Sequence, residues 1–253
     1  MTRAPLSGRV CLVTGATGGI GRATVSALAR RGALVVASGR DEGVLADLGR
    51  SQGVDSLRAD LEDVEGARRL AEEALAVHGR VDVLVNVAGA GLYGPVASLD
   101  PDELERVVRV NATAPIVLGR SLLPQMLARG SGHIVNVGSV VGHVGHGNEA
   151  AYAATKAALT IFTESLRSEL HGTGVGVSLV SPGVVGTRFF ERRGAPYDRR
   201  RPRPVAPDEV ASAVVAAIER DRAEVLVPGW LALPVRLRGA APGLYRALAR
   251  RFG

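Results

Sequence analysis

Short hydrophobic runs, rich in β-branched residues, alternate along this chain with longer stretches of mixed polar and apolar residues. The short runs predict β-strands at residues 10–14, 34–38, 54–58, 81–86, 133–137, 175–180 and 224–227. The longer stretches predict helices at residues 19–31, 42–50, 64–78, 101–128, 150–171 and 207–220. Several strands are apolar on both faces, which is typical of parallel strands covered on two sides. The pattern therefore predicts an α/β fold, a doubly wound parallel sheet of about seven strands with helices on both faces.

Two stretches depart from this alternation. Residues 188–203 hold seven arginines and two prolines, which is too charged and broken a sequence to predict regular structure. Because this stretch follows a strand end, we expect residues 188–206 to form a mobile basic flap over a cleft. Residues 228–253 mix leucines with five arginines and predict a basic amphipathic extension that packs on its own subunit or a partner subunit. Peripheral contact with a membrane surface is the alternative for this extension.

Composition and charge narrow the classes of function. Hydrophobic residues make up 46% and charged residues 22% of the 253 positions, as in ordinary globular proteins. The net charge of +6 is spread along the chain and aromatic residues are few, which argues against a nucleic-acid partner.

Compartment is predicted from cysteine use and from the apolar segments. The single cysteine, Cys11, permits no disulfide within the chain, so we expect a reducing, cytoplasmic location. The first predicted strand begins too early for a signal peptide to precede it. The apolar stretch at residues 225–235 is too short to span a bilayer.

Tyr152 and Lys156 form the most informative local pair. The chain has 31 lysine and arginine residues together, and Lys156 is the only lysine among them. Residues four apart share a helix face, so both side chains should point into the same space. A neighbouring cation lowers the pKa of a tyrosine from its ordinary value near 10. The pair therefore predicts a tyrosine tuned for proton transfer near neutral pH, although the pair alone also fits an incidental tyrosine beside a solvent-reaching lysine.

A glycine-rich loop follows the first predicted strand. It reads Thr14-Gly15-Ala16-Thr17-Gly18-Gly19-Ile20-Gly21 and leads directly into a predicted helix. Glycines allow a tight turn and a close approach of the backbone to a pyrophosphate, which rests on the amide end of the helix. In this position of an α/β chain, the loop predicts a dinucleotide site.

The end of the second predicted strand bears on the choice of dinucleotide. An acidic residue there binds the ribose 2′-hydroxyl of NAD, whereas a basic residue accommodates the 2′-phosphate of NADP. This chain reads Ser38-Gly39-Arg40, which favours NADP (NADPH) over NAD because Arg40 offers a fork of donors to a phosphate. Asp41 follows directly and would complicate this interpretation if it paired with Arg40.

Several short motifs along the chain belong to one ordered pattern. They are Thr14-Gly15-x-x-x-Gly19-x-Gly21, Asp60-Leu61, Asn86-Val87-Ala88-Gly89, Asn111, Ser139, Tyr152-x-x-x-Lys156, and Pro182-Gly183 followed by Thr187. On these motifs the chain resembles the short-chain dehydrogenase/reductase family over about residues 8–228. Val87 departs from the pattern, since the family often has a second asparagine there. The resemblance implies one Rossmann-fold domain over residues 1–253, with both cofactor binding and catalysis.

The resemblance assigns four catalytic residues. Tyr152 would protonate the carbonyl oxygen during reduction, and Lys156 would lower the pKa of that tyrosine and bind the nicotinamide ribose. Ser139 would donate a hydrogen bond to the substrate oxygen. Asn111 would hold a water that links the lysine to solvent. Taken singly, Ser139 would equally suit a strand-end turn, and Asn111 a helix residue bonded to its own backbone.

The resemblance also implies a cofactor site. It would comprise Gly15, Thr17, Gly19, Ile20, Gly21, Ser38, Arg40, Asp60, Leu61, Asn86, Ala88, Gly89, Pro182, Gly183 and Thr187, together with Tyr152 and Lys156. Asp60 would contact the adenine ring, or simply cap the following helix. Residues 86–89 would line the cofactor cleft, and Thr187 would approach the nicotinamide end.

The five histidines predict no metal site. His143 and His146 lie three residues apart in a glycine-rich stretch without an obvious third ligand. Their position between Ser139 and Tyr152 suggests that they line the substrate pocket, with exposed loop positions as the alternative.

Taken together, these features predict an NADP-dependent oxidoreductase that interconverts a ketone or aldehyde and an alcohol. The basic flap would suit an acidic acyl-carrier or CoA thioester, which makes a 3-oxoacyl reductase the first alternative. A non-catalytic NADP-binding redox sensor is the second. The resemblance further implies a homodimer or homotetramer built on the helices at 101–128 and 150–171, with a small-molecule substrate.

Overall fold

The computed structural model describes residues 5–252, with the side chains of residues 250–252 left undescribed. Within that range seven strands form one parallel sheet in the order β3-β2-β1-β4-β5-β6-β7. The strands are Val10–Val13 (β1), Leu34–Gly39 (β2), Asp55–Arg58 (β3), Val83–Asn86 (β4), Gly132–Val137 (β5), Val175–Pro182 (β6) and Glu224–Val227 (β7). The predicted doubly wound parallel sheet is therefore confirmed, with strand bounds within a few residues of those expected. Residues 1–4 and 253 of the expected domain lie outside the described residues.

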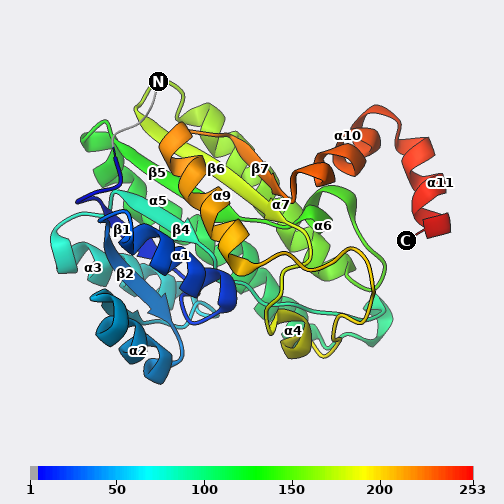
Figure 1. The fold of residues 1–253 in the computed structure, drawn as a ribbon, viewed down its shortest axis with the longest axis horizontal. Helices are drawn as coiled ribbons and strands as arrows, with labels where there is room; N and C mark the ends of the chain where they lie inside the picture. Colours follow the sequence, from blue (N-terminus) through cyan, green and yellow to red (C-terminus); the bar gives the residue numbers. More distant parts are fainter. Residues whose placement is uncertain (1–4, 253) are drawn as a thin grey trace.

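Helices cover both faces of this sheet (Figure 1). Their bounds are Gly19–Ala29 (α1), Glu42–Gln52 (α2), Val64–His78 (α3), Pro101–Val108 (α4), Ala114–Ala128 (α5), Val140–Val144 (α6), Ala150–Glu169 (α7), Phe189–Arg192 (α8), Pro207–Arg220 (α9), Ala232–Ala240 (α10) and Pro242–Phe252 (α11). One core cluster packs α1, α2 and α9 on one face, and a second packs α3, α5 and α7 on the other. Cys11 and Val13 join the first cluster and Val10 and Leu12 the second, because successive strand residues face opposite sides.

The helix expected over residues 101–128 is interrupted. A π-helical segment, Arg109–Thr113, separates α4 from α5. Pro115 lacks a backbone N–H and so cannot donate to the carbonyl of Asn111, which favours a wider turn at this point. The segment holds Asn111 fully buried, between Ala90 of the loop after β4 and Thr155 of α7.

The arginine-rich segment (residues 188–206) is more ordered than its charge predicted. It begins with the short helix α8, whose Phe189 and Phe190 are only partly exposed. These two rings give the segment an apolar face, and that face outweighs the arginines that flank it. The expectation that this segment lacks regular structure is thus wrong at α8.

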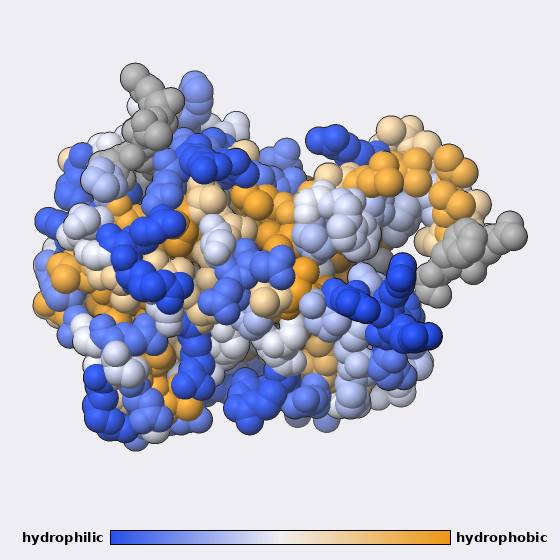
Figure 2. All heavy atoms as spheres, viewed as in Figure 1, coloured by the Kyte–Doolittle hydropathy of each residue, from blue (hydrophilic) through white to orange (hydrophobic). Residues whose placement is uncertain are grey.

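The C-terminal helices α10 and α11 extend away from the sheet (Figure 1). They are tied to the segment around α6, where the Arg238 guanidinium donates to the carbonyl of His143 and the Tyr245 hydroxyl donates to that of Val144 at 3.3 Å. Figure 2 shows apolar side chains along both helices, and Leu233 and Leu244 are exposed. The side chain of Phe252, which belongs to the expected amphipathic extension, lies outside the described residues. No helix in the described part of the chain meets the length and hydropathy of a membrane span.

Candidate active site

A cavity of about 930 Å³ opens along the carboxyl ends of the central strands. The chain crosses over between β3 and β4, so that β1 and β4 send their following loops to opposite sides. Such a switch point leaves a crevice where ligands bind in open α/β sheets. The residues that line the cavity come from the glycine-rich loop, from α7, which supplies Tyr152 and Lys156, and from the C-terminal segment, which supplies Leu231 and Tyr245.

The glycine-rich loop is shaped by contacts that leave no room for side chains. Gly15 has φ of +63°, and a Cβ added there would lie 2.7 Å from the backbone of Ala88. A Cβ on Gly39, at the end of β2, would lie 2.6 Å from the Thr17 side chain. Thr14 joins the glycine-rich loop to the loop that follows β4. Its hydroxyl oxygen accepts from the amides of Val87 and Ala88 at 3.1 and 3.2 Å.

This loop fits the pyrophosphate of a dinucleotide. The first turn of α1 reads Gly19-Ile20-Gly21-Arg22, so its amide end carries no acidic side chain that would repel an anion. Thr17, Gly19, Ile20 and Gly21 all line the cavity. The close packing of Gly15 on Ala88 brings the glycine-rich loop against the loop that follows β4.

At the end of β2, Arg40 is paired with Glu62 rather than with Asp41. Arg40 Nη1 lies 2.6 Å from Glu62 Oε1, and 63% of the Arg40 side chain is exposed. The carboxylate of Asp41 instead caps α2 and accepts from the amide of Val44 at 3.0 Å. The predicted complication from Asp41 is therefore wrong, and Glu62 takes its place. Ser38 lines the cavity beside Arg40 and is buried.

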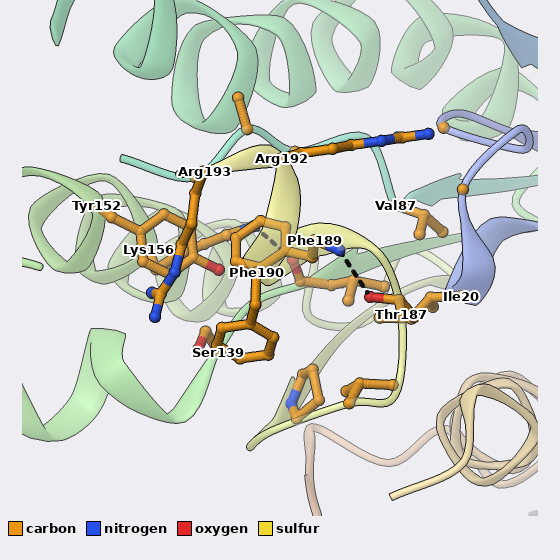
Figure 3. Close-up of a pocket in the computed structure, with 18 of the residues that line it drawn as sticks. Ile20, Val87, Ser139, Tyr152, Lys156, Thr187, Phe189, Phe190, Arg192 and Arg193 are labelled. Carbon is orange, nitrogen blue, oxygen red and sulfur yellow. Dashed lines mark hydrogen bonds between the residues drawn. The ribbon is translucent and has the colours of Figure 1, made fainter. Parts of the chain in front are cut away.

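Tyr152, Lys156 and Ser139 meet in the cavity wall (Figure 3). Ser139 follows β5 and caps α6, where its hydroxyl accepts from the amide of Val141 at 3.4 Å. Tyr152 and Lys156 both lie on α7 and are buried. The Lys156 ammonium donates to the carbonyl of Val137 at 2.9 Å and lies 6.0 Å from the centre of the Tyr152 ring.

Burial dominates the acidity of this group of side chains. It raises the pKa of Tyr152 above its ordinary value near 10, while a hydrogen bond with Ser139 acts in the opposite direction. Glu149 further raises the pKa of this phenol, and Arg193 lowers it. Burial also lowers the pKa of Lys156 to about 8. In this structure the Lys156 ammonium bonds the carbonyl of Val137, and the expectation that Lys156 lowers the Tyr152 pKa stays a prediction.

Asn111 holds the loop after β4 against α7. Its side-chain oxygen accepts from the amide of Ala90, and its nitrogen donates to the carbonyl of Ala90, both at 2.8 Å. The same nitrogen donates to the Thr155 hydroxyl at 3.1 Å. A Cβ on Gly89 would lie 3.4 Å from Asn111 Oδ1 and 3.6 Å from Lys156 Nζ, which brings the asparagine close to the lysine. The water-holding role of Asn111 stays a prediction, and bonding to its own helix is not observed.

The remaining predicted cofactor residues divide into two groups. Asp60, Leu61, Ala88, Gly89, Pro182, Gly183 and Thr187 line the cavity. Asp60 accepts from the amide of Glu62 at 3.0 Å and so shapes the turn after β3. Asn86 is absent from the cavity lining, because its amide nitrogen donates to Asn136 in the neighbouring strand at 2.8 Å. The expectation that Asn86 lines the cleft is therefore wrong.

His143 and His146, both expected to line the substrate pocket, lie in different surroundings. His146 lines the cavity, whereas His143 turns to the other side of α6. There its Nε2 lies 3.0 Å from the Ser181 hydroxyl and 3.1 Å from Glu224 Oε1. The described residues contain no group of three or more potential ligands that could hold a metal ion.

An aromatic and ionic cluster that the sequence pattern did not predict lies at the substrate end of the cavity. Arg193, which follows α8, pairs with Glu149, which precedes α7, at an N–O distance of 2.7 Å. Their side chains are only 6% and 10% exposed. Phe189 and Phe190 line the cavity beside this pair. The adjacent phenylalanines were a usable signal, since the chain has only four in total.

A sequence profile described as short chain dehydrogenase matches residues 9–198. The chain is 35% identical over 232 residues to "Ketoacyl reductase HetN" from Nostoc sp., a match that covers 88% of this chain and 79% of that protein.

Solved structures with the same fold include cofactor complexes. A short-chain dehydrogenase from Sphingobium yanoikuyae in complex with NADPH is 30% identical, with a TM-score of 0.82 over 93% of this chain and 94% of the other. A short chain dehydrogenase/reductase from Burkholderia phymatum in complex with NAD is 28% identical, with a TM-score of 0.86 over 96% of each chain.

Proposed function

Because the chain belongs to the short-chain dehydrogenase/reductase family, we propose that it is an NADP(H)-dependent oxidoreductase that interconverts a ketone or aldehyde and an alcohol. One observation carries this proposal. The side chains of Tyr152 and Ser139 both lie in the wall of a cavity that continues to the glycine-rich loop. A proton donor, a second donor and a dinucleotide cradle thus share one enclosed space.

The choice of NADP is supported by the end of β2. Arg40 is the first charged residue after that strand, and the acidic residue next to it in sequence, Asp41, caps α2 rather than pairing with Arg40. Glu62 competes for the Arg40 guanidinium, although the exposed Arg40 side chain can turn to a phosphate. Solved structures of this fold contain NADPH in one case and NAD in another, so they do not favour either dinucleotide. The preference for NADP therefore rests on Arg40.

When bound, the nicotinamide supplies the hydride for reduction or accepts it in oxidation. In reduction, Tyr152 gives its phenolic proton to the substrate oxygen, and Ser139 donates a hydrogen bond to that oxygen as negative charge develops. The Lys156 ammonium stabilises the phenolate left on Tyr152. With a pKa of about 8, Lys156 is still mostly charged at neutral pH. In oxidation, Tyr152 takes the alcohol proton back.

A 3-oxoacyl reductase is the second candidate within the same chemistry. It is supported by the name of the Nostoc relative and by the exposed arginines of the arginine-rich segment. Arg192 and Arg199 line the mouth of the cavity, where a phosphate of a CoA or carrier-protein thioester would meet them. Activity that falls steeply with added salt would favour this candidate.

Assembly as a homodimer or homotetramer and action in the cytoplasm are part of the proposal. Exposed Ile116 on α5 and Ile161 on α7 support self-association through these helices. The buried thiol of Cys11, whose pKa burial raises to about 12, suits a reducing compartment. The arginine-rich segment is proposed to act as the substrate flap.

The first test is NADPH binding followed by a set of carbonyl substrates. NADPH fluorescence should report tight binding, NADH should bind more weakly, and NADPH oxidation should follow addition of a ketone or aldehyde. Tyr152→Phe should retain NADPH binding and lose about 100-fold or more of the turnover. NADPH binding without turnover of any carbonyl compound would favour the redox-sensor alternative, and failure to bind either nucleotide would contradict the proposal.

A further inference from the structure

Aromatic rings run in a row outward from the catalytic tyrosine. The centres of the Tyr152 and Phe189 rings lie 5.5 Å apart, those of Phe189 and Phe190 5.6 Å, and those of Phe190 and Tyr197 5.4 Å. These separations are in the range of favourable ring–ring contacts. All four of these side chains line the cavity (Figure 3 shows the first three). The substrate end is therefore bounded by a continuous aromatic wall that begins at Tyr152.

The Arg193–Glu149 ion pair completes this wall. The Arg193 guanidinium lies 4.8 Å from the centre of the Tyr93 ring and 4.5 Å from that of Phe190. Its Nη1 bonds Glu149 at 2.7 Å, so the cation is held between two rings and is neutralised by a carboxylate. The buried charges next to Tyr152 thus cancel.

The arginine-rich segment packs directly on the backbone of Gly91. A Cβ at Gly91 would lie 2.8 Å from Cβ of Arg193 and 2.9 Å from Cζ of Phe189. The Phe189 ring and the Arg193 stem therefore rest directly on the backbone of the loop after β4. This contact fixes the rings over the cavity.

We propose that the space beside Tyr152 binds an uncharged ketone whose carbonyl is attached to an aromatic ring, with Phe189 and Phe190 as the specificity-determining residues. This proposal rests on the proposed oxidoreductase function. A flat ring adds to the row of aromatic side chains and gains contacts that a flexible alkyl chain makes less well. The substrate oxygen then lies within reach of Tyr152 and Ser139.

A charged substrate is disfavoured by the same geometry. A carboxylate on the substrate would have to displace Glu149 in order to pair with Arg193, which leaves Glu149 buried and unpaired. A cation would meet Arg193 at the aromatic wall. The ion pair therefore selects against both signs of charge, while the exposed arginines outside it remain free to contact anions at the mouth.

The test compares matched substrates with NADPH. Acetophenone, 2-octanone, 4-acetylbenzoate and acetoacetyl-CoA represent the neutral aromatic, neutral aliphatic, charged aromatic and carrier-bound classes. We expect kcat/KM for acetophenone to exceed that for 2-octanone about three- to tenfold. It should exceed that for 4-acetylbenzoate by about tenfold or more, because breaking a buried ion pair is costly. A preference for 2-octanone, 4-acetylbenzoate or acetoacetyl-CoA would overturn the proposal.

Three variants assign the preference to its residues. Phe189→Leu and Phe190→Leu keep an apolar side chain and remove a ring, so each should lower the acetophenone to 2-octanone ratio about threefold or more. Phe162→Leu is the matched control, since Phe162 packs against the core away from the cavity and should leave the ratio unchanged. Glu149→Gln should raise relative activity on 4-acetylbenzoate, because Arg193 is then free for the substrate carboxylate. Unchanged ratios in all three variants would overturn the residue assignment.

A binding measurement separates this proposal from the proposed function. Calorimetry with Tyr152→Phe, in which turnover is removed, measures ketone binding in the presence of NADP⁺. Acetophenone binding without wild-type turnover would support the aromatic site and contradict the proposed reaction. Turnover of aliphatic ketones with no acetophenone binding would support the proposed reaction and contradict the aromatic site.

Discussion

The Lys156 ammonium donates a hydrogen bond to the carbonyl oxygen of Val137 at 2.9 Å while its side chain is buried. A single carbonyl dipole replaces the hydration of the charge only in part, so burial lowers the pKa of Lys156 to about 8. The lysine is thus poised between its two protonation states at mildly alkaline pH. Its titration has consequences for both stability and activity.

Lys156 should make folding stability depend on alkaline pH. In the unfolded chain its pKa is near 10.5, so between about pH 8 and 10.5 the unfolded state binds more protons than the folded state. The free energy of unfolding of the wild type, relative to Lys156→Met, should therefore rise across this window by on the order of 3 kcal/mol. Urea unfolding of both proteins at several pH values measures this difference, and parallel curves would contradict the lowered pKa.

Ser139→Ala should move the pH profile of alcohol oxidation to higher pH. The hydrogen bond from Ser139 opposes the rise in the Tyr152 pKa, so its loss leaves the phenol harder to ionise. Oxidation needs the ionised form as base, and its alkaline-rising limb should shift upward while kcat falls about 10- to 1000-fold. The measurement is kcat against pH, with Ser139→Thr expected to restore the wild-type position of the limb in part. A fall in kcat with an unmoved limb would argue against this hydrogen bond.

Gly15→Ala should destabilise the protein more than a matched substitution elsewhere. Gly53 has nearly the same backbone conformation, φ +64° against +63°, but a Cβ there would meet nothing within 4 Å. Gly53→Ala should cost about 1 kcal/mol from the left-handed backbone alone. Gly15→Ala should cost about 1–3 kcal/mol more because its Cβ meets the Ala88 backbone. Thermal unfolding of both variants tests this, and equal losses would mean that the loop adjusts freely.

Arg40→Ala should weaken NADPH binding about tenfold or more and leave NADH binding nearly unchanged, since only NADPH carries the 2′-phosphate. Glu62→Gln should strengthen NADPH binding, because it releases Arg40 from its carboxylate partner. Arg50→Ala is the matched control, an exposed arginine on α2 that does not line the cavity. Fluorescence titration with both nucleotides gives the result. Equal losses for NADPH and NADH would show that Arg40 does not read the phosphate.

Much of the fold could be predicted because its determinants are local. The alternation of strands and helices follows from hydrophobic periodicity, and each predicted strand is found with bounds shifted by at most a few residues. The break in the helix over residues 101–128 was missed. Its local cause, Pro115, is visible in the sequence, but the packing of Asn111 against Ala90 is not.

The site divides in the same way. The sequence by itself determined the glycine-rich loop after β1, the placing of Tyr152 and Lys156 on one helix, and the family to which the chain belongs, since all depend on residue type and short spacing. Only the tertiary structure decided which polar groups meet. Arg40 pairs with Glu62, Asn86 with Asn136, and Arg193 with Glu149, over separations of 22 to 50 residues. Burial, which sets the acidity of Tyr152 and Lys156, is a property of the packed chain, because the removal of water from a side chain depends on every element around it.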